Sequence, residues 1–124
     1  MRVSDLLGRW RIVSMEMWDG DYIDMETKAF IEIEKGGDGQ FQFGLVSGSI
    51  DWERAEDADD MRLEFTWEGM DEMDECNGSG WIELESKRLL KGRIKFHGGD
   101  ASGFEAKRIK PRGQASIKNK AKRK

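Results

Sequence analysis

Acidic side chains and the single histidine gather in segments that carry few large apolar residues. Asp71, Glu72 and Asp74 form one group, and His97 and Asp100 form a second. Carboxylates beside an imidazole can attract a divalent cation, a cationic ligand or a basic protein partner, and they can exchange protons near neutral pH. We call these five residues the acidic mouth. The alternative interpretation is a solvated rim that carries no chemistry.

Patterns that specify a particular chemistry do not accompany these residues. The chain has no C-x-x-C or H-x-x-x-H spacing, no calcium loop, no phosphate-binding loop and no dinucleotide fingerprint, and its single cysteine is Cys76. The sequence therefore predicts no metal, no cofactor and no assigned catalytic residue. An enzyme that uses the acidic mouth stays as an alternative, because catalysis depends on geometry that sequence does not give.

Alternation of apolar and polar residues predicts the strands that hold these groups. In the clearest run, Met61, Leu63, Phe65 and Trp67 share one face, and the polar residues between them share the other. A period of two is typical of a strand with one buried face. The expected strands cover residues 8–18, 29–34, 40–45, 48–52, 61–68, 80–85, 90–96 and 102–108.

The connections between these strands are short, which favours hairpins. Residues 36–39 are expected to form a glycine hairpin, residues 19–28 a loop or short helix, and residues 69–78 an acidic loop. The outer residues of strands 80–85 and 90–96 carry opposite charges, as neighbouring strands should. Ser4 is expected to cap a short helical turn over residues 5–7, before strand one.

The fold class predicted is all-β, a small closed up-and-down antiparallel barrel of about eight strands. Closing such a sheet removes its edges. A Greek-key barrel or a sandwich fits the same alternation. In the up-and-down barrel the loops after strands one, three, five and seven meet at one end, so the acidic mouth should converge there.

The start of strand one carries a motif with a partner at the end of the chain. Gly8-Arg9-Trp10 follows the helical turn, and Arg108 has the inward phase of the last strand. This arrangement resembles the G-x-W signature of the lipocalins and the wider calycin group. The resemblance implies a lipocalin-like barrel in which a basic residue of the last strand lies across the tryptophan. A guanidinium over an indole contributes roughly 0.5–2 kcal/mol.

Two further runs resemble segments of small uncharacterised bacterial proteins. They are W-E-G-M-D-E-M-D at residues 67–74 and H-G-G-D-A-S at residues 97–102. This likeness brings no activity with it.

The inward residues of the barrel are candidates for contact with a small, mostly apolar ligand, as the calycin resemblance implies. Gly44, Gly48, Gly80 and Gly92 are expected to leave space beside the aromatic side chains. The alternative is a barrel filled by its own side chains that acts as a protein interaction module through its acidic open end. The predicted ligand-binding residues are Phe43, Phe65, Trp67, Ile82, Ile94 and Phe96.

Composition limits the setting of this barrel. The 124 residues suit one domain, residues 1–109, followed by a basic tail, residues 110–124, that holds seven of the 21 basic residues and no acid. A single cysteine, no signal peptide and no apolar run long enough to span a membrane predict a cytoplasmic protein. Nucleic acid is an unexpected partner that only the tail could contact, because residues 1–109 hold 25 acidic against 14 basic residues. The sequence does not define the oligomeric state.

Overall fold

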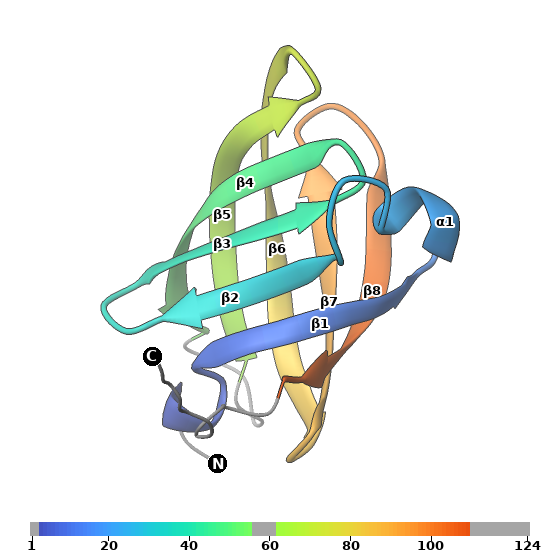
Figure 1. Cartoon of the computed structure of the whole chain (residues 1–124). Helices are drawn as coiled ribbons and strands as arrows, with labels where there is room; N and C mark the ends of the chain where they lie inside the picture. Colours follow the sequence, from blue (N-terminus) through green and yellow to red (C-terminus); the bar gives the residue numbers. More distant parts are fainter. Residues whose placement is uncertain (1–2, 56–61, 110–124) are drawn as a thin grey trace, which may run out of the picture.

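A computed structural model describes residues 3–55 and 62–109, which form one closed antiparallel barrel (Figure 1). Each strand pairs with the next along the chain, and the last pairs with the first. The predicted up-and-down barrel is therefore confirmed, and the Greek-key alternative is excluded. The strands are β1 (Gly8–Met15), β2 (Phe30–Glu34), β3 (Asp38–Phe43), β4 (Val46–Arg54), β5 (Arg62–Asp71), β6 (Asp74–Ser86), β7 (Leu89–Phe96) and β8 (Ala101–Arg108).

The apolar face of each strand builds the core, as the period of two predicts. In β5, Leu63, Phe65 and Trp67 are buried, while Glu64, Thr66 and Glu68 between them are exposed. Met61 lies outside the described residues. One hydrophobic cluster runs through the interior and includes Trp10, Phe41, Phe43, Ile82, Ile94 and Phe104.

Two local predictions need correction. The turn before β1 is a 3-10 helix over Val3–Asp5, so Ser4 lies inside it and does not cap a later turn. Residues 69–78 are not an acidic loop, because β5 and β6 pair up to Asp71 and Asp74 and leave a two-residue turn. Gly69 and Gly78 are strand residues there, and their missing side chains let neighbouring backbones approach closely.

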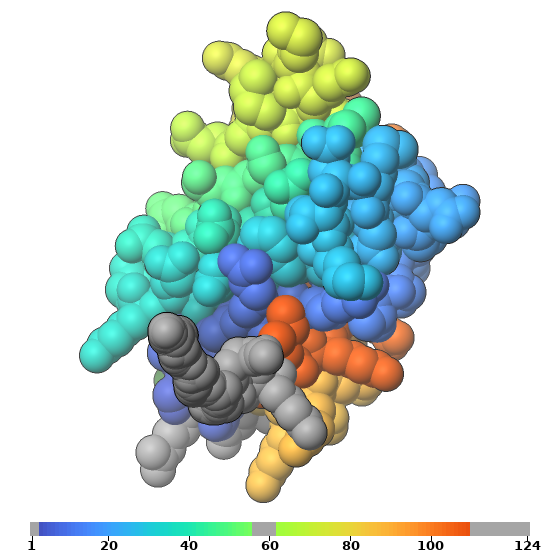
Figure 2. Space-filling view, viewed as in Figure 1, coloured from blue at the N-terminus to red at the C-terminus, as the bar shows by residue number. Residues whose placement is uncertain are grey.

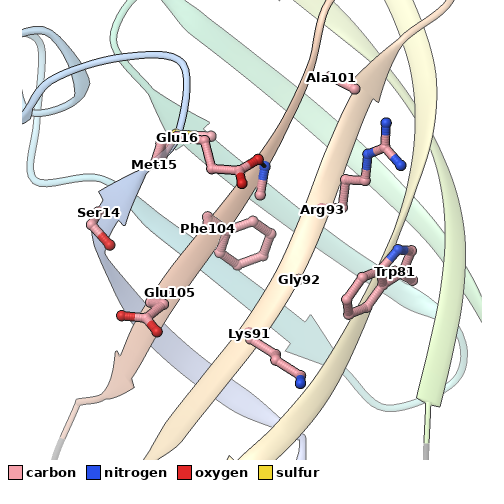
Figure 3. Close-up of a pocket in the computed structure, with 11 residues that line it drawn as sticks. Ser14, Met15, Glu16, Trp81, Lys91, Gly92, Arg93, Ala101, Phe104 and Glu105 are labelled. Carbon is pink, nitrogen blue, oxygen red and sulfur yellow. Dashed lines mark hydrogen bonds between the residues drawn. The ribbon is translucent and has the colours of Figure 1, made fainter.

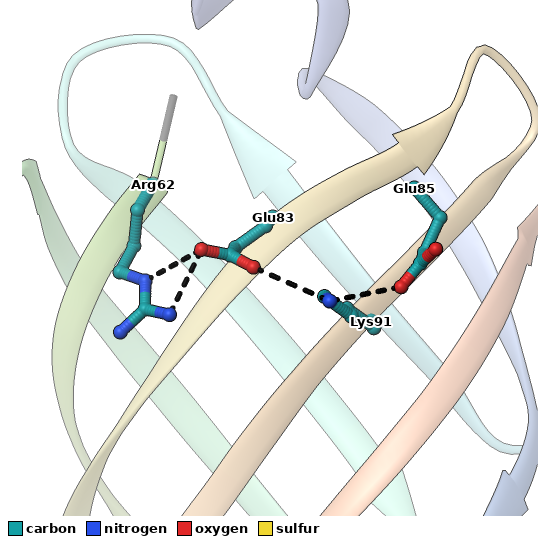
Figure 4. A network of polar contacts seen from close by, with 4 residues as sticks. All are labelled: Arg62, Glu83, Glu85 and Lys91. Carbon is teal, nitrogen blue, oxygen red and sulfur yellow. Dashed lines mark hydrogen bonds and ion pairs between the residues drawn. The ribbon is translucent and has the colours of Figure 1, made fainter. Parts of the chain in front are cut away.

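The outer face of β5, β6 and β7 carries the predicted pairing of opposite charges (Figure 4). Glu83 on β6 accepts from both Nε and Nη2 of Arg62, at 2.8 Å each. Lys91 on β7 lies 2.9 Å from Glu85 and 3.7 Å from Glu83, and these carboxylates raise its pKa above the ordinary value. The network holds the side chains of this face in defined positions.

The basic tail, residues 110–124, lies outside the described residues, together with residues 1–2 and 56–61. Within residues 3–55 and 62–109, no helix is long and apolar enough to cross a membrane.

Candidate functional site

The end of the barrel opposite Gly8 is formed by four connections that hydrogen-bond to one another or to neighbouring strands; we call it the open end. The backbone N–H of Gly44 donates to the carbonyl of Ile23 at 2.8 Å, and that of Glu72 donates to Leu45 at 2.9 Å. The N–H of His97 donates to Asn77 at 2.8 Å, and that of Met17 to the hydroxyl of Ser102 at 3.1 Å. These contacts make the open end a single supported surface.

The connection from β1 to β2 folds over the open end through the short helix α1 (Gly20–Ile23). Asp19 caps this helix by accepting from the N–H of Tyr22 at 3.0 Å. Asp24 accepts from the N–H of Ala29 at 2.8 Å and pairs with Arg11 at 2.8 Å. These two carboxylates therefore hold the loop in place.

The five residues of the acidic mouth lie at this end, in or next to the turns after β5 and β7, because β6 and β7 carry the chain along the barrel and back. Asp71 is half-buried, and Glu72, Asp74, His97 and Asp100 are exposed. Among the residues that the structure describes, no group of three or more His, Cys, Asp or Glu side chains is arranged to hold a metal ion. The carboxylates among them give the open end a negative electrostatic potential.

Exposed methionines accompany these acids, and the sequence analysis missed them. Of the five methionines in the described residues, only Met15 is buried. Met17 and Met25 lie in the β1–β2 connection, and Met70 and Met73 lie in the β5–β6 hairpin, each 37–86% exposed. In the space-filling view the yellow-green β5–β6 hairpin forms the top of the molecule, and the blue β1–β2 connection lies below it on the right (Figure 2). Met25, Met70 and Met73 stand in predicted loops, where an apolar side chain has no strand face to bury. Met17 was predicted to belong to strand one, residues 8–18, but β1 ends at Met15.

Cys76 lies on β6 next to this end, paired with Gly69. Burial and then the charges of Asp71 and Asp74 raise the pKa of its thiol above the ordinary value. The protonated thiol is therefore the form that the folded chain favours, and its contribution to stability is lost as the pH rises through the raised pKa.

We expect alkylation of Cys76 by iodoacetamide to be slow at neutral pH, because the thiolate is the reacting form. Its rate should rise with a midpoint above that of a free cysteine, and the variant D71N/D74N should move the midpoint down. Mass spectrometry over a pH series measures both. A midpoint at or below that of free cysteine would contradict the effect of burial.

The residues predicted to bind an apolar ligand line the interior and pack on one another. Phe43, Phe65, Trp67, Ile82 and Ile94 are buried, and Phe96 is half-buried. The ring of Trp67 lies 5.1 Å from that of Phe96, edge to face. Trp18, from the β1–β2 connection, contacts Phe43 with 5.1 Å between ring centroids and closes the interior at the open end.

The glycines expected to leave internal space do not leave it. A Cβ atom on Gly48 would lie 2.7 Å from the ring of Phe41, and one on Gly80 would lie 2.5 Å from Phe65. Gly44 faces the ring of Tyr22 in the same way, and Gly92 faces the ring of Phe104. The glycines make room for the protein's own rings.

The opposite end holds the predicted pair of Trp10 and Arg108. The guanidinium carbon of Arg108 lies 4.1 Å from the centre of the Trp10 ring, and the two residues face each other across β1 and β8. Arg108 also donates to the carbonyl of Leu7 at 3.0 Å and to that of Asp5. Burial lowers its pKa, and the charge of Asp5 opposes that effect. The predicted stacking is confirmed.

Gly8 completes this arrangement. Its φ of 112° favours glycine, and a Cβ atom there would lie 3.3 Å from Nη1 of Arg108. The three signature residues Gly8, Trp10 and Arg108 therefore join the first strand to the last.

Fold and site together define a small, eight-stranded up-and-down barrel in which the inward aromatic rings pack on one another, with an acidic, methionine-bearing open end. Comparison of the chain with protein-family models, with curated proteins and with solved structures gave no match.

Proposed function

We propose that this protein is an interaction module whose open end binds a basic, amphipathic segment of a partner protein. The observation that carries the proposal is the exposure of Met17, Met25, Met70 and Met73 on that one end. Methionine is flexible and polarizable, and it is frequent on surfaces that accept varied apolar side chains. An apolar partner face would cover these methionines and gain the free energy of their burial.

The negative charge of the open end favours a partner segment with positive charge. Its exposed acids include Glu26, Glu72, Asp74, Glu75 and Asp100, against Lys28 in the β1–β2 connection. Complementary charge speeds encounter and fixes orientation, whereas apolar contacts supply most of the affinity. A segment that alternates basic and apolar residues matches both properties of the surface.

The interior is the alternative place for binding, and it suits a ligand less well. An apolar molecule there would have to displace rings that already pack in contact, such as Phe41 and Trp67 at 5.1 Å. A filled barrel loses packing energy when its rings separate. We therefore place binding at the surface.

We also infer a calycin-like relationship and a cytoplasmic setting. The stacking of Arg108 on Trp10 supports the first inference. The single, half-buried Cys76, which has no disulfide partner, supports the second.

The proposal is tested with a synthetic amphipathic peptide of lysine and leucine, labelled for fluorescence anisotropy. We expect a Kd of about 10 μM and NMR shifts confined to residues 17–28, 44–45, 70–75 and 97–100. The variant M17Q/M25Q/M70Q/M73Q should bind at least about tenfold more weakly, because four apolar contacts are lost.

Two controls distinguish specific binding at the open end from a general attraction between the acidic protein and a basic peptide. The variant V13Q/I109Q replaces exposed apolar residues outside the open end and should bind like the parent protein. A peptide of the same composition in scrambled order should bind weakly. Equal binding of the scrambled peptide, or undiminished binding by the methionine variant, would show that the proposal is wrong.

A further inference from the structure

The outer face of β6, β7 and β8 contains a hollow of about 570 Å³, which Ser14 and Met15 of β1 and Glu16 of the β1–β2 connection also line (Figure 3). Sites for small molecules commonly measure about 300–1,000 Å³. Gly103 on β8 lies directly opposite Arg93 on β7, and because it has no side chain the carboxylate of Glu16 packs over its backbone, where a Cβ atom would lie 3.0 Å from Oε1 of Glu16. The register of these two strands therefore brings Arg93 and Gly103 together at the hollow.

One wall of the hollow is an aromatic ring held in position. Trp81 projects from β6 and faces Arg93 across the β6–β7 pair. The guanidinium carbon of Arg62 lies 4.0 Å from the centre of the indole ring, and Glu83 in turn binds Arg62. An immobilised indole can stack on a flat ligand at little entropic cost.

Two charged side chains at the hollow have no partner among the residues that the structure describes. Glu105 stands directly opposite Lys91, but Lys91 binds Glu85 and Glu83 instead. Neither Glu105 nor Arg93 makes an ion pair or a side-chain hydrogen bond with any residue in the described ranges. In contrast, the carboxylate of Glu16 accepts from the N–H of Gly103 at 2.8 Å.

The free charges lie on opposite walls. Figure 3 shows Trp81, Arg93 and Lys91 on one side of the hollow, and Glu16 and Glu105 on the other. A simple anion would gain from Arg93 but meet repulsion from the two glutamates, and a simple cation would meet the reverse. A molecule that carries both a negative and a positive group can pair with the charged side chains on both walls.

We propose that this hollow binds a small aromatic zwitterion of the amino acid type. Arg93 receives the carboxylate, Glu105 receives the ammonium group, and the aromatic ring lies against Trp81. This site does not depend on the proposed function of the open end.

The experiment compares four probes by NMR titration of the full-length protein. L-phenylalanine has the ring and both charges, 3-phenylpropionate lacks the ammonium group, phenethylamine lacks the carboxylate, and glycine lacks the ring. We expect L-phenylalanine to bind with a Kd of about 1 mM and to shift residues 81, 91–93 and 103–105. The other three probes should bind at least about tenfold more weakly.

Charge-neutral variants assign the two contacts. R93Q and E105Q should each weaken L-phenylalanine binding about tenfold. R93Q should not weaken the binding of phenethylamine and should strengthen it slightly, because it removes a like charge, and E105Q should do the same for 3-phenylpropionate. The control variants K35Q and E53Q alter exposed charges on the far side of the barrel and should bind L-phenylalanine like the parent protein.

Three results would overturn the proposal. They are the absence of saturable binding of L-phenylalanine up to about 10 mM, equal affinity for 3-phenylpropionate, and undiminished affinity in both R93Q and E105Q. All variants are checked for folding by the dispersion of their NMR spectra.

Discussion

Replacing Trp10 with alanine is expected to remove about 3–5 kcal/mol from the free energy of unfolding, the range for deleting a large buried aromatic side chain. The indole is fully buried, and its N–H donates to the carbonyl of Leu6 at 3.0 Å. It also supports the guanidinium of Arg108. Since a domain of this kind has only about 5–15 kcal/mol in total, the variant should be largely unfolded or close to it.

Urea unfolding followed by circular dichroism measures this loss, and two more variants keep the measurement possible if W10A does not fold. W10F retains a ring and loses the hydrogen bond to Leu6, so it should cost about 1–2 kcal/mol. W81A removes a half-buried indole on the outer face that Arg62 covers, and it should cost about 1 kcal/mol. If W10A cost no more than W81A, Trp10 would not join the ends of the barrel as we describe.

The barrel itself could be predicted because its main determinant is local. Alternation such as Leu63, Phe65 and Trp67 fixes which face is buried, and short turns between successive strands fix their order. The pairing of Trp10 with Arg108 was expected from the resemblance to the lipocalin signature, and the inward phase of Arg108 in the last strand agreed with it.

The candidate sites were harder to predict from the sequence because they depend on the registers between strands. Gly69 and Gly78 suggested a loop, and only the pairing of β5 with β6 shows them to be strand residues at close backbone approaches. The acidic mouth could be located from strand count, but exposed methionines in loops have no period to reveal them. The free charges beside Trp81 depend on the strand register that places Gly103 opposite Arg93. They also depend on the ion pair of Lys91, which forms with Glu85 and not with Glu105.

Replacing Gly78 with alanine is expected to cost about 3 kcal/mol or more, at the upper end of the range for overpacking. A Cβ atom at this position would lie 1.8 Å from the carbonyl oxygen of Lys95 and 2.9 Å from Nε1 of Trp67. That same carbonyl accepts the indole N–H of Trp67 at 3.2 Å. The β6 and β7 backbones would have to separate, and the hydrogen bond of the buried tryptophan would be disturbed with them.

The matched control for this substitution is G20A. Gly20 has no atom within 4 Å of its hypothetical Cβ and no positive φ, so alanine there should change stability by less than about 0.5 kcal/mol. Thermal unfolding compares the two variants, and hydrogen exchange at Lys95 and its neighbours shows whether the loss begins at the β6–β7 pair. A G78A protein as stable as G20A would mean that β6 and β7 can separate there at little cost, and that glycine is not required for their close approach.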